Sequence, residues 1–149
     1  MRALLDVNVL VALLDAAHLH HRAATAWLAT HVEKGWASCP LTQNGCVRIL
    51  SLPAYQNAQA PAAVVDRLAR AAAGKRHEFW PDSVSVLEPG RLRWDHVLSS
   101  RQITDVYLLA LAVANGGRLV TLDRGIATSA VPGATRRHLV VLGAEAEVT

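Results

Sequence analysis

Three aspartates that lie far apart in the sequence are the residues of this chain best suited to chemistry. Asp6 and Asp123 each follow a short hydrophobic segment, and Asp105 opens a longer one. Carboxylates that converge raise one another's pKa unless a cation lies among them. Oxygen ligands, with no His or Cys at ligand spacing, favour Mg²⁺, or Mn²⁺ as a substitute, over zinc. Such an ion lowers the pKa of bound water and stabilises charge on a phosphate, so the pattern indicates metal-dependent phosphate chemistry.

The segments around these acids alternate between strand and helix patterns. We expect strands at 2–6, 36–39, 78–80, 118–121 and 139–142, and helices at 9–14, 18–33, 42–50, 61–73 and 104–114. Thr42 is expected to cap the third helix, and Gly35 to stop the second. Residues 83–94 show no clear pattern. This alternation, without repeats or linkers, predicts one α/β domain over residues 1–149 with a largely parallel sheet.

Such a sheet explains how the three acids could form one site. Ligands of parallel α/β sheets bind beyond the carboxyl ends of the strands, where right-handed crossovers place both Asp6 and Asp123. Asp105, in the first turn of a helix, points to the same edge. Each acid also has an ordinary interpretation: Asp6 as a helix cap, Asp105 as a first-turn acid and Asp123 as a turn residue. Their shared position at one edge favours the common site.

Composition narrows the classes of protein that remain. The chain carries a formal net charge of +3 and has 52% hydrophobic residues, as a compact folded protein does. Two lysines among fifteen cations leave thirteen arginines, the side chain best shaped for phosphate contacts. Two cysteines cannot form a disulfide framework, and no apolar run is long enough to span a bilayer. Asp6 interrupts any signal-peptide core, so we expect a cytoplasmic protein with no membrane partner.

The motifs that carry the acids resemble those of the PIN-domain endoribonucleases, and more closely the VapC type of bacterial toxin. The resemblance runs over essentially the whole chain, and it is carried by the order and spacing of its motifs. The matching segments are Leu4–Leu10, Pro40–Gln43, Val47–Ile49, Ile103–Ala110 and Leu119–Asp123.

The resemblance implies a three-layer α/β/α sandwich with a mainly parallel sheet of four to five strands, and Mg²⁺-dependent cleavage of structured RNA such as tRNA or rRNA. Asp6, Asp105 and Asp123 would be the catalytic and metal-binding acids. Asn8 and Thr104 would be polar neighbours that orient ligands or phosphate. The chain would be a homodimeric toxin held by a small VapB-like antitoxin.

The chain departs from the family pattern at one position. The second acid of the family is expected at position 43, where this chain carries Gln43, a neutral side chain that cannot act as a general base. Three interpretations remain open: a subgroup that works with three acids, an engineered disarming, or an inactive relative. Thr42-Gln43 with an arginine shortly after resembles a natural pattern in a subset of these toxins, which favours the first. Glu78 and Asp82 could supply further acidic groups, although a surface role is the simpler interpretation.

Arginines near the proposed site are the candidates for contact with RNA phosphates. Arg48, Arg101 and Arg124 each lie within a few residues of a proposed site position, although surface ion pairs would also account for them.

Two rival functions remain. A receiver-like phosphoryl-transfer domain would need adjacent acids on the first strand and a lysine after the last, a pattern that this chain lacks. A catalytically weakened or inactive PIN-like module that binds RNA or protein would retain the fold and owe its loss of activity to Gln43.

Overall fold

A five-stranded parallel sheet forms the centre of the molecule in the computed structural model, which describes residues 1–143. The strands are β1 (Ala3–Leu5), β2 (Trp36–Ser38), β3 (His77–Phe79), β4 (Arg118–Thr121) and β5 (Leu139–Val141). They are arranged in the order β3-β2-β1-β4-β5, and all four neighbouring pairs are parallel. The chain therefore moves outward from β1 in one direction and later returns to the other side of β1. This makes the carboxyl ends of β1 and β4 the switch point at which such sheets bind ligands.

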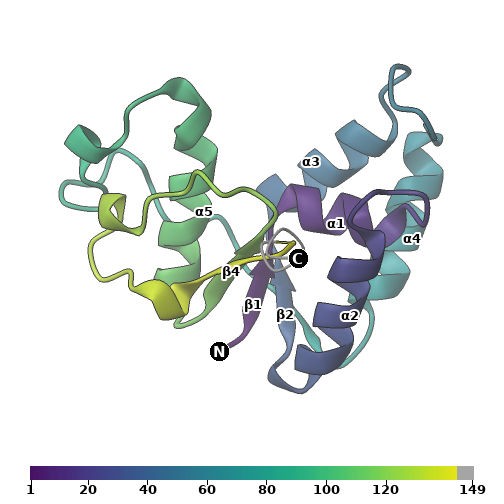
Figure 1. Cartoon of the computed structure of the whole chain (residues 1–149), viewed down its shortest axis with the longest axis horizontal. Helices are drawn as coiled ribbons and strands as arrows, with labels where there is room; N and C mark the ends of the chain where they lie inside the picture. Colours follow the sequence, from purple (N-terminus) through teal and green to yellow (C-terminus); the bar gives the residue numbers. More distant parts are fainter. Residues whose placement is uncertain (144–149) are drawn as a thin grey trace.

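Helices cover the two faces of this sheet. The described residues form five α-helices, which are α1 (Val7–Leu14), α2 (His21–His31), α3 (Pro40–Leu50), α4 (Pro61–Ala72) and α5 (Ile103–Ala114). Figure 1 shows α1 to α4 on one side of the sheet, and α5 with the irregular segments around it on the other. The predicted three-layer α/β/α sandwich and its parallel sheet are thus confirmed.

The strand β1 separates two hydrophobic cores because successive side chains of a strand point to opposite faces. Leu4 packs in the core built around α5, with Leu108 and Leu111. Ala3 and Leu5 pack in the core formed by the helices on the other face. Most of α5 is buried, as its apolar sequence predicts. Both faces of β1 are therefore held by packing, which fixes the position of the residue that follows the strand, Asp6.

The helix α3 begins at Pro40 and not at Thr42 as expected, because Cys39 occupies the capping position. The Thr42 hydroxyl accepts a hydrogen bond from the Cys39 N–H (3.0 Å) and donates one to the Cys39 carbonyl (3.1 Å). Thr42 thus stabilises the start of the helix from within its first turn.

The helix α2 is shorter than expected. It spans only His21–His31 and continues into a 3₁₀ turn at Val32–Lys34. Gly35, at φ 78°, ends that turn as predicted.

The contact between α1 and α3 sets the shape of the adjoining site. A Cβ atom at Gly45 would lie 2.6 Å from Cγ2 of Val7, so only glycine allows the two helices to approach this closely. Among the described residues, no helix is long and apolar enough to cross a membrane.

Candidate active site

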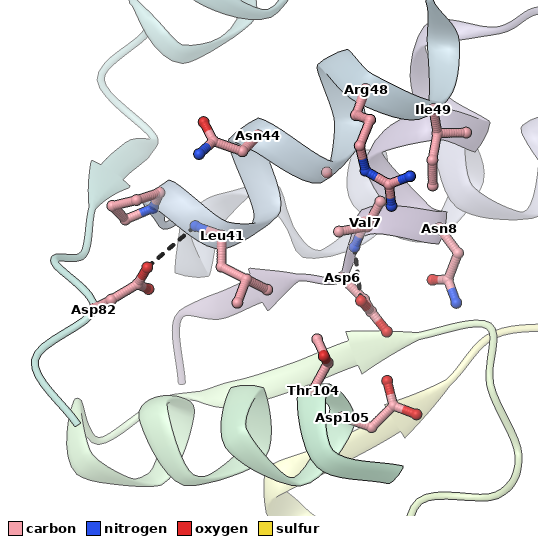
Figure 2. A pocket seen from close by; sticks show the side chains of 12 residues that line it. Asp6, Val7, Asn8, Leu41, Asn44, Arg48, Ile49, Asp82, Thr104 and Asp105 are labelled. Carbon is pink, nitrogen blue, oxygen red and sulfur yellow. Dashed lines mark hydrogen bonds between the residues drawn. The ribbon is translucent and has the colours of Figure 1, made fainter. Parts of the chain in front are cut away.

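An open hollow of about 630 Å³ lies at the carboxyl ends of the central strands, between α3 and the first turn of α5. Figure 2 shows its walls, with Asp6 and Asp105 directed toward one another. We call it the acid hollow. It is lined by Asp6, Val7, Asn8, Pro40, Leu41, Asn44, Gly45, Arg48, Ile49, Asp82, Thr104 and Asp105.

Asp6 is a buried carboxylate that follows β1 and caps α1. Only 5% of the residue is exposed. One carboxylate oxygen accepts a hydrogen bond from the Val7 N–H (2.7 Å), and the other accepts one from the Thr121 hydroxyl (2.7 Å). Burial raises the pKa of Asp6, the two hydrogen bonds oppose that rise, and the charge of Asp123 adds to it. The capping interpretation and the site interpretation of Asp6 are therefore compatible.

Asp105 is the third residue of α5 and lies in the wall opposite Asp6. The pKa of Asp105 is raised to about 7, first by burial and then by the charges of Asp6 and Asp123 and a hydrogen bond with Asp123. Burial and the neighbouring negative charges thus both favour the protonated form of Asp105. The fold thus brings acids from three distant parts of the sequence within electrostatic reach of one another.

Asp123 occupies the outer part of this group. It is exposed and does not line the acid hollow. Its carboxylate accepts a hydrogen bond from the Gly125 N–H (2.7 Å), the turn interaction that its sequence context also suggested. Within residues 1–143, no three carboxylate, imidazole or thiol groups are close enough to share one ion as they stand. The three acids are electrostatic neighbours, but they do not form a preassembled three-ligand cluster.

Thr121 connects the parts of the site, and it was not among the residues predicted from the sequence. This fully buried residue ends β4. Its hydroxyl donates to Asp6 and accepts from the Asp123 N–H (3.0 Å) and from the Asn8 amide (3.4 Å). A polar residue at the buried end of a strand, two positions before an acid, was the available signal.

The two polar residues expected to support the acids, Asn8 and Thr104, both line the acid hollow. Asn8 also binds the end of β4, because its side-chain oxygen accepts a hydrogen bond from the Leu122 N–H (3.2 Å). Thr104 is exposed and lies beside Asp105, on the same side of the hollow in Figure 2.

Gln43 lies outside the acid hollow. Its side-chain amide donates a hydrogen bond to the Ser38 hydroxyl (2.9 Å), and the residue lines a separate hollow between α3 and α4. The residues of α3 that line the acid hollow are instead Pro40, Leu41, Asn44, Gly45, Arg48 and Ile49. Gln43, predicted as a polar residue that supports the acids, is thus not among the residues that line the acid hollow in this structure.

The three arginines predicted to contact RNA phosphates differ in whether they line the acid hollow. Arg48 lines the acid hollow, and its guanidinium makes no ion pair or hydrogen bond with any described residue. Arg101 and Arg124 are exposed outside the hollow, and Arg124 donates a hydrogen bond to the Gly143 carbonyl (3.4 Å). Arg48 is therefore the arginine best placed to meet a substrate held by the acids.

The two further acids named from the sequence also differ in position. Asp82 lines the far end of the acid hollow and accepts a hydrogen bond from the Leu41 N–H (3.2 Å). Glu78 forms an ion pair with Arg2 at the surface (3.1 Å), as the simpler interpretation expected.

Known proteins with similar sequences match nearly the whole chain. The family model described as PIN domain matches residues 3–131. The Mycobacterium tuberculosis protein named Ribonuclease VapC44 is 53% identical over 142 residues, covering 95% of this chain and 100% of that protein. Ribonuclease VapC39 of the same organism is 43% identical over 134 residues, covering 89% and 96%.

Two solved structures share the fold. One is VapC20 of Mycobacterium tuberculosis, described as a Sarcin-Ricin loop cleaving toxin, with a TM-score of 0.55, 12% identity, and coverage of 78% of this chain and 85% of that one. The other is VapBC2 of Rickettsia felis, described as bound to a DNA fragment from its promoter, with a TM-score of 0.57, 17% identity, and coverage of 83% and 89%. The family model and the sequence matches show that this chain belongs to the PIN-domain family, among its VapC ribonucleases.

Proposed function

We propose that this protein is a divalent-metal-dependent endoribonuclease that acts as the toxin of a toxin–antitoxin pair. The observation that carries the proposal is the opposition of Asp6 and Asp105 across an open hollow at the sheet's switch point. Burial and then the charge of Asp6 raise the pKa of Asp105, so two ionised carboxylates in this position are unfavourable without a cation. An arrangement that a cation would stabilise is expected of a metal site.

The donor set fits Mg²⁺, with Mn²⁺ as a substitute. Mg²⁺ prefers oxygen ligands, retains several waters and is commonly held by only one or two carboxylates. Asp6 and Asp105 would provide these, with Asp123 close enough to join through a water or a small movement. When bound, the ion supplies Lewis-acid stabilisation of the phosphate and lowers the pKa of bound water.

The remaining residues position the acids and the substrate. Thr121 fixes one oxygen of Asp6 and thereby orients that carboxylate toward the hollow. The proton that Asp105 retains in its hydrogen bond with Asp123 would be released when a cation replaces it. Arg48, which is free of protein partners among the described residues, is placed to contact an RNA phosphate in the same hollow.

Partners follow from the same assignment. We expect structured RNA as the substrate, a small VapB-like antitoxin as the inhibitor, a homodimer as the working assembly and the cytoplasm as the compartment. Residues 1–149 would form one nuclease domain. The family membership and the mildly basic charge of +3 support these expectations.

An inactive binding module is the second candidate function, and Gln43 was the observation in its favour. Because Gln43 contacts Ser38 and does not line the acid hollow, its neutral side chain gives no reason for a loss of catalysis. We therefore favour an active ribonuclease over an inactive binding module.

A Mg²⁺ titration with a structured RNA tests the proposal. The wild-type protein should cleave only when Mg²⁺ is present, chelator should stop the reaction, and Asp6→Asn should be inactive at every Mg²⁺ concentration. Binding of the RNA without cleavage by either protein would instead identify a binding module. Cleavage that chelator leaves unchanged would contradict the metal site.

A further inference from the structure

Besides Arg48, the wall that α3 contributes to the acid hollow contains a second polar residue without a polar contact to the rest of the described chain, Asn44. Asn44 lies at the fifth position of α3, too far into the helix to cap it. It is exposed, it lies at the border between the acid hollow and the hollow between α3 and α4, and its side chain makes no hydrogen bond with any residue between 1 and 143. Asparagine is an unfavourable residue in a helix interior, because its side chain competes for backbone hydrogen bonds. A residue that weakens its own helix without a compensating contact points to a ligand.

The neighbouring residue shows what a structural explanation would look like. Gly45 is also a poor helix former, but a side chain there would clash with Val7, so packing of α1 against α3 requires it. Asn44 has no such contact. Its carboxamide offers one acceptor and two donors to the hollow.

The rest of the hollow suits a nucleotide. Arg48 lies one helical turn after Asn44, about 6 Å further along the axis, and so shares its face of α3. Figure 2 shows the two side chains leaving the helix in different directions, Arg48 above Asp6 and Asn8, and Asn44 away from these two residues. Between them the wall is apolar, formed by Leu41, Val7 and Ile49.

We propose that Asn44 is a specificity-determining residue, which reads the edge of an unpaired RNA base next to the phosphate that is cleaved. This inference rests on the proposed function, because the acids must hold the phosphate for the adjoining base to reach α3. The described residues that line the hollow include no aromatic side chain, so the base would lie against aliphatic groups and be recognised through hydrogen bonds at its edge. A carboxamide in such a position discriminates by pairing its donor and acceptor with those of the base.

The test compares the cut sites of four proteins on a pool of RNA hairpins whose single-stranded loops have random sequence, with the bases around each cut identified by sequencing. The proteins are wild type, Asn44→Ala, Asn44→Asp and a matched control, Gln56→Ala. Gln56 is an exposed carboxamide outside the hollow, in the turn after α3. The overall cleavage rate of each protein is measured on the same pool.

The wild type and Gln56→Ala should share a preference at one position beside the cut, of about fivefold to tenfold. Asn44→Ala should remove the base preference at that position and leave the preferences at the other positions unchanged. Asn44→Asp carries only acceptors, so it should shift the same position toward guanine, whose edge presents two adjacent N–H donors.

The outcomes separate this inference from the function on which it rests. Active Asn44 variants with the wild-type profile at every position would overturn the inference alone. Asn44 variants that cleave more slowly with an unchanged profile would likewise exclude base reading. If the wild-type protein cleaves no RNA with Mg²⁺ present, both the proposed function and this inference fail.

Discussion

Two buried aspartates stand at opposite ends of α1 and illustrate two uses of the same side chain. Asp6 precedes the helix and is 5% exposed, and Asp15 follows it and is 8% exposed. Asp15 accepts hydrogen bonds from the Tyr55 hydroxyl, from the Ala17 N–H (3.0 Å) and from the Asn57 amide (3.5 Å). The Tyr55 hydrogen bond is the main cause of a lowered pKa at Asp15. The environment of Asp15 stabilises its charge.

The environment of Asp6 does the opposite. Burial and the charge of Asp123 raise the pKa of Asp6, and the pKa of Asp105 is raised to about 7. Similar exposure of the two residues thus accompanies opposite pKa shifts, because burial is the largest cause at Asp6 and the Tyr55 hydrogen bond is the largest cause at Asp15. Low solvent exposure alone therefore does not identify a functional acid. A buried acid whose neighbours are also acids is the one that we propose to bind a cation.

Asp105→Asn should reduce catalysis more than a change at Thr121 or Asp15. Loss of a carboxylate from the proposed metal site should lower the rate of RNA cleavage at least about 100-fold, which corresponds to roughly 3 kcal/mol of transition-state stabilisation. The free energy of unfolding of the metal-free protein should be unchanged or higher, because repulsion with Asp6 is relieved. Cleavage assays and urea denaturation check the two expectations, and an active Asp105→Asn protein would contradict the site.

Thr121→Val should have a smaller effect that acts through Asp6. The isosteric change removes the hydroxyl that donates to Asp6 and accepts from the Asp123 N–H. Changes of this kind around metal ligands commonly cost about 10- to 100-fold in affinity or activity. The pH at which cleavage reaches half its maximum should rise, because Asp6 loses a hydrogen bond that lowers its pKa. Thr121→Ser should restore the profile; a rate loss with an unshifted pH profile would indicate a purely structural role.

Asp15→Asn makes the same chemical change at the other end of α1 and should affect stability alone. Weakening the hydrogen bonds to Tyr55 and Ala17 should lower the free energy of unfolding by about 1–2 kcal/mol. The cleavage rate should stay within about twofold of wild type under conditions where both proteins are folded. Thermal denaturation and the RNA assay provide the two readouts, and a large loss of activity in folded Asp15→Asn would remove the contrast between the two acids.

The acids at the two ends of α1 should also differ in how they make the free energy of unfolding depend on pH. Because the pKa values of Asp6 and Asp105 are raised, the folded metal-free protein binds more protons than the unfolded chain between about pH 4 and pH 7. The contribution of these acids to stability is therefore present at low pH and is lost as pH rises through that window. Asp15, with its lowered pKa, contributes stability above about pH 4 that is lost only in stronger acid.

Melting temperatures of wild type and Asp105→Asn in chelator measure this difference. The wild type should lose stability between about pH 5 and pH 7 relative to the variant, and Mg²⁺ should restore it mainly above about pH 7, where proton competition ends. Parallel pH profiles for the two proteins would contradict the raised pKa of Asp105.

Sequence reasoning could place the acids because strand topology decides their position. A residue that follows a parallel strand must lie at the carboxyl edge of the sheet, whatever the details of packing, and this places Asp6 and Asp123. Asp105 was found because a helix that follows a strand in this architecture begins at the same edge. The five parallel strands follow from the same alternation of hydrophobic segments.

Positions on α3 could not be assigned in this way. Each helical residue is rotated by about 100° from the last, so a shift of one or two residues moves a side chain to another face. That rotation is fixed here by the close contact of Gly45 with Val7, which is long-range and invisible in the sequence. Gln43 was therefore predicted as a site residue and Asn44 was not, although Asn44 lines the acid hollow and Gln43 does not. Thr121 was missed because a buried threonine at the end of a strand resembles an ordinary strand residue.

Binding of Mn²⁺ is the decisive measurement for a metal site between Asp6 and Asp105. Wild type, Asp105→Asn and Asp15→Asn are titrated with Mn²⁺ at about pH 7.5, above the pKa of Asp105, and the free ion is followed by electron paramagnetic resonance. Wild type and Asp15→Asn should bind the ion with equal affinity, and Asp105→Asn should bind it at least about tenfold more weakly. Equal binding by all three proteins, or no binding by the wild type, would contradict the site.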